Sequence, residues 1–134
     1  MKKYFFIYVS IAIFVFLSAC SQKQTTTLNL PEKSDIVKIY YIAENEYKST
    51  TDKENIDNLL FELSQIKSKT FDSFQDTPLV EKYSEINFEM SIGTSSNKVF
   101  VYKTKEGFFV EQPYNGIFTI NESQYQSIVG VFSN

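Results

Sequence analysis

The sequence predicts an α+β domain in which an antiparallel sheet carries its helices on one face, in the chain order β-α-β-β-β-β-α. Three observations support this fold class. Apolar and polar residues alternate over residues 85–92, two segments place apolar residues at helical spacing behind capping residues, and turn signals divide the remaining apolar runs into short strands. With 134 residues, the chain is long enough for one domain with one modest core.

The first strand and the first helix lie in the segment 35–66. Residues 35–43, DIVKIYYIA, are rich in Ile, Val and Tyr and are apolar on both faces, which is typical of a strand inside a sheet. Apolar residues at helical spacing then predict a helix over 52–66. Thr51 is the expected N-cap of this helix, with Glu54 as its capping-box partner.

An irregular segment, 67–80, separates this helix from four further strands. The expected strands cover residues 85–92, 98–104, 108–112 and 117–120. The alternating apolar residues of the first of them, which should face the core, are Ile86, Phe88, Met90 and Ile92. Glu106-Gly107 indicates one hairpin turn. Asn115-Gly116 indicates a second, in which both residues are expected at positive φ.

A second helix closes the chain. Asn121 is its expected N-cap, and Gln124 is the reciprocal partner of a capping box. The apolar stripe of this helix, which should dock on the sheet, consists of Tyr125, Ile128, Val129 and Phe132. The resulting order of elements resembles the TATA-binding-protein-like topology, and this comparison concerns the fold alone.

The composition excludes several kinds of chemistry. The chain has no His, which excludes a Ser-His or Cys-His relay and a His-ligated metal. Its one Cys cannot form an internal disulfide or a Cys-rich zinc site. A net charge of −3 without a basic block argues against nucleic-acid binding. We therefore expect no metal, no cofactor and no nucleic-acid partner.

The N-terminus predicts an exported lipoprotein. Lys2 and Lys3 precede an apolar stretch over residues 4–17, whose helix would rise only ~21 Å against a bilayer core of ~30 Å. A basic start, a short apolar segment and small residues are typical of a secretory signal, and an uncleaved membrane anchor is the alternative. Residues 17–20, LSAC, resemble the lipobox of bacterial lipoproteins, in which the Cys, here Cys20, receives a diacylglyceryl group. The alternative for this residue is a buried structural Cys.

These features divide the chain into three parts. Residues 1–19 are the expected signal peptide, residues 20–34 the lipidated Cys and a flexible tether, and residues 35–134 a single α+β domain. The tether could span roughly 45 Å when extended. The acidic domain is expected to stand off an anionic membrane surface, on the outer face of the cytoplasmic membrane of a Gram-positive bacterium.

The most distinctive segment is EQPYNGIF, residues 111–118. One interpretation is a well-specified hairpin, since Pro113 fits a strand end and Asn115-Gly116 supplies the positive-φ positions of a tight turn. The other is an exposed recognition loop. The candidate binding residues of this loop are Glu111, Gln112, Tyr114 and Asn115.

Together with Tyr102-Lys103, the EQPYNGIF segment resembles a family of small Firmicute lipoproteins catalogued as domain of unknown function 5301. The resemblance extends over roughly residues 35–134 and includes the Asp-x-Pro turn at 76–78 and the closing helix. It implies a lipid-anchored extracytoplasmic domain with no established activity, and it therefore carries over no catalytic residues.

One face of the predicted sheet remains to be covered. The aromatic residues expected on its strands are Tyr40, Tyr41, Phe100, Tyr102, Phe108 and Phe109. Because the helices cover one face, several of these rings must point to the other. They lie either under a cover, formed by the irregular segment 67–80 or by the tether, or in an exposed binding surface.

The leading functional hypothesis is a non-enzymatic binding protein with a protein or peptide partner in the cell envelope. Protection against bacteriocins or phage is one such role. The alternative is a cell-envelope hydrolase that uses Glu111 with Asp72 or Asp76, and a glycosidase would need the two carboxyls ~5–9.5 Å apart. A third possibility is a structural or chaperone-like helper of a membrane complex.

Overall fold

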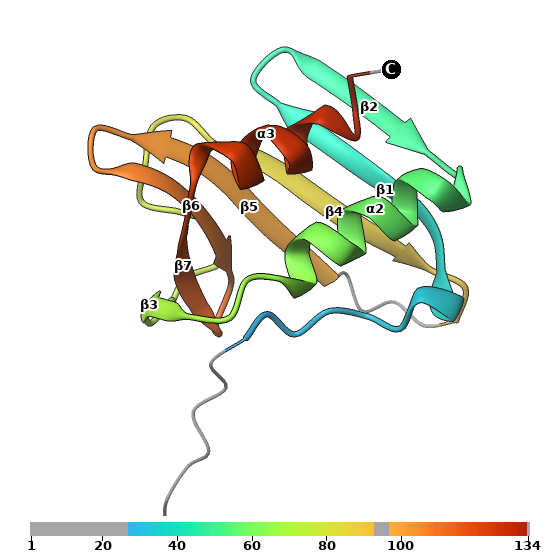
Figure 1. Ribbon diagram of the computed structural model, residues 1–134, viewed down its shortest axis with the longest axis horizontal. Coiled ribbons are helices and arrows are strands. Elements are labelled where there is room, and N and C mark those ends of the chain that lie inside the picture. The colour runs from blue at the N-terminus through green and yellow to red at the C-terminus, as the bar shows by residue number, and fades with distance from the viewer. Residues whose placement is uncertain (1–26, 93–96, 134) are drawn as a thin grey trace, which may run out of the picture.

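The computed structural model describes residues 27–92 and 97–133. The described part of the chain forms a seven-stranded antiparallel sheet, and both α-helices lie on the same face of it (Figure 1). The predicted α+β class is therefore confirmed. The expected signal peptide and lipobox lie outside the described residues.

Seven strands, two α-helices and one 3₁₀ turn make up the described domain. The strands are β1 (Ile36–Ala43), β2 (Glu46–Thr50), β3 (Lys69–Phe71), β4 (Ser84–Met90), β5 (Asn97–Thr104), β6 (Gly107–Gln112) and β7 (Gly116–Ile120). The helices are η1 (Lys33–Asp35), α2 (Lys53–Ser64) and α3 (Glu122–Gly130). The sheet order is β2-β1-β4-β5-β6-β7-β3. Without the two edge strands, the chain order is the predicted β-α-β-β-β-β-α.

The sequence did not predict the edge strands β2 and β3. Strand β2 pairs with β1 in a hairpin, and its first four residues are exposed, so EYKST shows no apolar alternation. Strand β3 has three residues and pairs only with β7. Edge strands are commonly short and polar, which protects their free edges from aggregation and also removes the pattern that would reveal them.

The turn between β6 and β7 differs from its prediction. Tyr114 has φ 57°, whereas Asn115 and Gly116 do not have positive φ, so the expected Asn-Gly turn is wrong. Gly116 instead begins β7, where a Cβ would lie 2.2 Å from Cδ of Lys69 and 3.0 Å from the carbonyl oxygen of Phe71. Its lack of a side chain therefore lets β3 approach β7.

The helix starts are set by capping side chains. The N-cap of α2 is Asp52, whose carboxylate accepts the backbone N–H of Glu54, so the predicted cap at Thr51 is one residue too early. A carboxylate here also meets the positive end of the helix dipole. The capping box of α3 is confirmed: Asn121 Oδ1 accepts from the Gln124 N–H at 2.8 Å, and Gln124 Oε1 accepts from the Asn121 N–H at 3.1 Å.

The main core lies between the helices and the sheet. Leu59 and Leu63 from α2 and Ile128 from α3 are completely buried against it. The sheet residues of this cluster include Ile39, Ile86, Val99, Val101, Val110 and Phe118. The expected apolar stripe of α3 is confirmed. Ile92 is an error in the predicted pattern: it follows the end of β4 and is exposed.

A second, smaller cluster lies on the opposite face of the sheet. Phe100, Tyr102 and Phe109 are buried there, with Val80 and Tyr83 packed against them. The segment 72–83 crosses behind β5 and β6 and covers this half of the face (Figure 1). Of the two interpretations of the aromatic face, the covering segment is therefore correct over β5 and β6. Tyr41 and Phe108 face the helices, and they pack on Phe132 and Tyr125.

The folded domain begins before residue 35. Leu28 is buried in the main core, and residues 27–32 run along the lower edge of the sheet (Figure 1). The structure therefore contradicts a flexible tether for residues 27–34, whereas residues 20–26 lie outside the described part. None of the described helices is long and apolar enough to cross a membrane.

Candidate functional site

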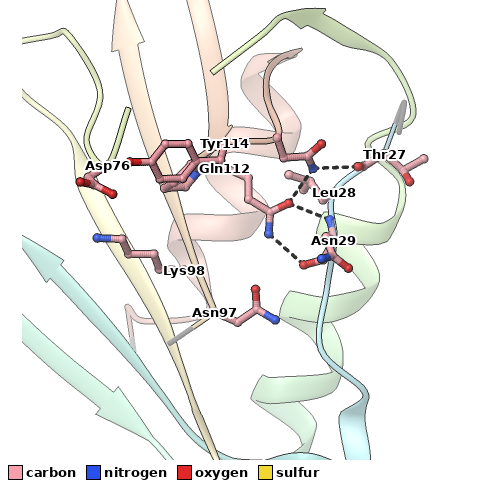
Figure 2. Close-up of a pocket in the computed structure, with 10 residues that line it drawn as sticks. Thr27, Leu28, Asn29, Asp76, Asn97, Lys98, Gln112 and Tyr114 are labelled. Carbon is pink, nitrogen blue, oxygen red and sulfur yellow. Dashed lines mark hydrogen bonds between the residues drawn. The ribbon is translucent and has the colours of Figure 1, made fainter. Parts of the chain in front are cut away.

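An open cleft of about 660 Å³ lies where β6 turns into β7, beside the N-terminal segment (Figure 2). Its size falls within the ~300–1,000 Å³ typical of ligand sites. The residues that line it are Thr27, Leu28, Asn29, Asp76, Asn97, Lys98, Gln112, Pro113, Tyr114 and Asn115. Three of the four predicted loop residues, Gln112, Tyr114 and Asn115, are thus brought together here.

Gln112 is the central hydrogen-bonding residue of the cleft. Its Nε2 donates to the Asn29 carbonyl at 2.8 Å, and its Oε1 accepts the Asn29 N–H at 2.7 Å. Asn115 Nδ2 donates to the same Oε1 at 2.7 Å and to the Thr27 carbonyl at 3.0 Å (Figure 2). The two carboxamides therefore bind the backbone of residues 27–29 as a neighbouring strand would.

Tyr114 projects from the turn on the other side of the cleft. It is 69% exposed, and its left-handed backbone (φ 57°) is uncommon for a residue other than Gly. Figure 2 shows its hydroxyl beside Asp76. The Asp76 carboxylate, as hydrogen-bond acceptor and as negative charge, raises the pKa of Tyr114. A strained backbone that exposes an aromatic ring is a common feature of binding sites.

Asn97 and Lys98, at the start of β5, complete the polar lining. The Lys98 ammonium lies 5.1 Å from the centre of the Phe100 ring and forms no ion pair with any described residue. The Asn97 side chain has no hydrogen-bond partner in the described part of the chain. The cleft thus offers a cation from Lys98, an anion from Asp76, and the Asn97 side-chain amide, which forms no hydrogen bond within the described residues.

Glu111 does not belong to the cleft, so its inclusion in the candidate loop is wrong. Successive residues of a strand point to opposite faces, and Glu111 therefore faces away from Gln112. It is buried under the segment 72–83, where it accepts the Ser73 hydroxyl at 2.7 Å and the Tyr102 hydroxyl at 3.0 Å. Burial raises the pKa of Tyr102 above its ordinary value, and the neighbouring Glu111 charge adds to this effect.

The three carboxylates named for the hydrolase alternative each have a different partner in the structure. Both oxygens of Glu111 have partners on the covered face, Asp72 pairs with Lys69 at 2.7 Å, and Asp76 lies beside Tyr114. Among the described residues that line the cleft, Asp76 is the sole carboxylate. No cluster of three or more metal-ligating His, Cys, Asp or Glu side chains occurs among the described residues.

The sequence interpretation did not place the residues of other segments beside the 111–118 turn, although it named Asp76 as a candidate acid. Asn29 and Thr27 come from the expected tether, Asp76 from the irregular segment, and Lys98 from the start of a strand. One signal was present: Leu28 and Leu30 are two apolar residues at strand spacing within a polar stretch. Asp76 and Lys98 had no such signal, because only the tertiary fold brings them near Gln112.

The fold and the cleft define a small α+β domain whose N-terminal segment is docked at a polar site. The family model DUF5301, described as "Domain of unknown function (DUF5300)", matches residues 24–119, and the chain belongs to this family. The match begins before residue 27, in agreement with an N-terminal segment that is part of the domain.

A solved structure is also similar to this chain. It is an NMR structure of a protein from Ruminococcus gnavus, with 30% sequence identity and a TM-score of 0.60. The similarity covers 71% of this chain and 95% of that one. A search of curated proteins finds no significant match.

Proposed function

We propose that this chain is a lipid-anchored extracytoplasmic binding protein whose cleft takes an extended peptide segment of an envelope partner. The anchor is the diacylglyceryl-modified Cys20, and the binding residues are those of the polar cleft. The lipobox supports the first part of this proposal, and the pairing between Gln112 and Asn29 supports the second.

The pairing between Gln112 and Asn29 is the observation that carries the peptide assignment. A peptide backbone presents one donor and one acceptor at each residue, and a carboxamide matches both. Gln112 and Asn115 already bind a backbone in this way within the molecule. Asn97 offers the same groups at the open side of the cleft, beside Lys98.

The charged residues and Tyr114 supply selectivity for side chains. Lys98 and Asp76 present opposite charges on the same side of the cleft (Figure 2). Tyrosine is enriched at binding hot spots because it brings a large rigid ring at low entropic cost. The ligand we propose is therefore an extended peptide with an acidic group opposite Lys98 and an apolar side chain against the Tyr114 ring.

The binding experiment is a selection with a matched control. A phage-displayed random heptapeptide library is panned on the purified lipidated protein in detergent micelles, and enriched peptides are measured by calorimetry. Lys98→Ala should weaken binding at least tenfold, about 1.4 kcal/mol. Lys105→Ala, which removes the same charge from the exposed turn between β5 and β6, should leave it unchanged. No enrichment, or equal effects of the two variants, would contradict a peptide site at this cleft.

The anchor is tested separately by Cys20→Ser. This variant should accumulate as a precursor or be released, while the parent chain remains membrane-bound and incorporates labelled fatty acid. A variant that is processed to unchanged size and stays in the membrane would show that Cys20 is not the anchor. A protective role against bacteriocins or phage stays a prediction, to be tested by killing assays on cells without the protein.

A further inference from the structure

We infer that the docked N-terminal segment holds the cleft at the membrane-proximal end of the domain, so that its peptide ligand is the juxtamembrane segment of a membrane-embedded partner. This inference rests on the proposed lipid anchor at Cys20. It goes beyond that proposal because it assigns the orientation of the domain and the kind of partner it meets.

The first step is the length of chain between the anchor and the domain. Residues 27–29 are bound to Gln112 and Asn115, and Leu28 is buried in the core. Only the seven peptide units from Cys20 to Thr27 remain to separate the lipid from the domain. At ~3.6 Å for each residue, the fully extended span is at most about 25 Å. A tether reaching to residue 34 would have allowed almost twice this distance.

The second step is the place where that chain enters the domain. Thr27 itself lines the cleft, and its carbonyl accepts a hydrogen bond from Asn115. The distance between the lipidated Cys20 and the cleft is therefore at most about 25 Å in every orientation of the domain. The hairpin turn between β1 and β2 lies at the opposite end of the molecule (Figure 1). A domain of this size has a radius of gyration of about 13 Å, so this far turn can stand well away from the bilayer.

The third step is the consequence for the ligand. A site confined to a layer close to the bilayer meets peptide segments that are held in the same layer at a high effective concentration. A segment that follows directly from a transmembrane span satisfies this condition, and its extended backbone matches the carboxamides of the cleft. The net negative charge of the chain makes anionic lipid headgroups a poorer match.

The orientation is tested with the lipidated full chain on vesicles of phosphatidylglycerol and phosphatidylcholine that carry a short-range quencher on their headgroups. The lipid occupies the only Cys of the chain, so an introduced Cys is the sole labelling site. Thr77→Cys places a fluorophore at the cleft rim beside Asp76, and Asn45→Cys places it at the far turn. Both positions are exposed.

We expect several-fold stronger quenching at position 77 than at position 45. A Gly/Ser spacer of about twenty residues between Lys23 and Gln24 adds roughly 25 Å of root-mean-square reach and should remove most of the difference. Equal quenching, or stronger quenching at position 45, in protein that floats with the vesicles would overturn the orientation and leave the anchor intact. Protein that does not float would overturn the anchor, and the inference with it.

The partner is tested in native membranes. A photo-crosslinking residue replaces Thr77, and a protease site is inserted between Lys23 and Gln24. After irradiation, the tether is cut and the membranes are sedimented. An adduct that stays in the membrane pellet, while uncrosslinked domain is released, supports a membrane-embedded partner. An adduct that is released with the domain, or no adduct at all, would overturn it.

Discussion

The two faces of the sheet are closed by different means. On one face, α2 and α3 bury a continuous apolar cluster in which Leu59, Leu63 and Ile128 are fully inaccessible. On the other face, over β5 and β6, the irregular segment 72–83 covers three aromatic rings and the Glu111 carboxylate. Helices can close a face by apolar burial alone, whereas an irregular segment here also depends on hydrogen bonds to a buried charge.

The strongest test of this comparison uses two phenylalanines that are both fully buried, Phe118 on the helix face and Phe100 on the loop face. Replacing a buried Phe by Ala costs about 3–5 kcal/mol, and the cost depends on how far the site can collapse. We expect Phe118→Ala to lie at the upper end of this range, because helices and sheet enclose it. Phe100→Ala should lie at the lower end, because the segment 72–83 can settle into the space.

Urea denaturation of the two variants and the parent measures this difference as free energies of unfolding. A larger loss for Phe100→Ala would mean that the irregular segment is packed as rigidly as the helices. The distinction between the two faces would then be wrong.

The second test removes the hydrogen bonds that hold the loop face. Tyr102→Phe or Ser73→Ala leaves the buried Glu111 carboxylate with one of its two hydroxyl donors. A lost hydrogen bond to a buried charged group costs about 1.5–3 kcal/mol. Hydrogen exchange should quicken in the segment 72–83 while α2 and α3 keep their protection. Uniform loss of protection over both faces would contradict an independent role for this network.

The third test is the stability of the protein at alkaline pH. Burial holds the pKa of Tyr102 above its ordinary value, so the folded state keeps its proton at a pH where the unfolded chain loses it. The stability that Tyr102 contributes is therefore complete below pH ~10 and is lost as the pH rises above that value. The free energy of unfolding falls by up to about 1.4 kcal/mol per pH unit in this range.

Tyr40 on β1 is the control for Tyr102, because it lies on the same face of the sheet but outside the part that the segment 72–83 covers. A hydrogen bond to Glu89 raises the pKa of Tyr40 to about 12, although its hydroxyl is exposed. Urea midpoints between pH 8 and pH 11 should fall less steeply in Tyr102→Phe than in the parent, and the effect of Tyr40→Phe should be smaller. A steeper fall in Tyr102→Phe would mean that the buried tyrosine does not contribute to the alkaline loss.

These contrasts also explain which parts of the molecule the sequence could predict. The five predicted strands, β1 and β4 to β7, and both helices each place one face in the core. Their sequences therefore show the apolar periodicity that predicted them. The opposite orientations of Glu111 and Gln112 could have been inferred from strand alternation alone. Tyr114 at positive φ could not, because no local preference places Tyr there. The cleft as a whole is lined by four segments that only tertiary packing brings together.

The smallest expected effect concerns the helix face, at the start of α2. The structure assigns the N-cap to Asp52, although the capping-box pattern in the sequence favours Thr51. Asp52→Ala should cost about 0.5–2 kcal/mol, because it removes the acceptor for the Glu54 N–H and the favourable charge at the helix N-terminus. Thr51→Ala, at an exposed position without a capping bond, should stay within about 0.5 kcal/mol of the parent. The helix-face core does not depend on this cap, so even the larger loss should leave the cooperativity of unfolding unchanged. If Thr51→Ala proved the more costly of the two, α2 would begin one residue earlier, as the sequence pattern predicted.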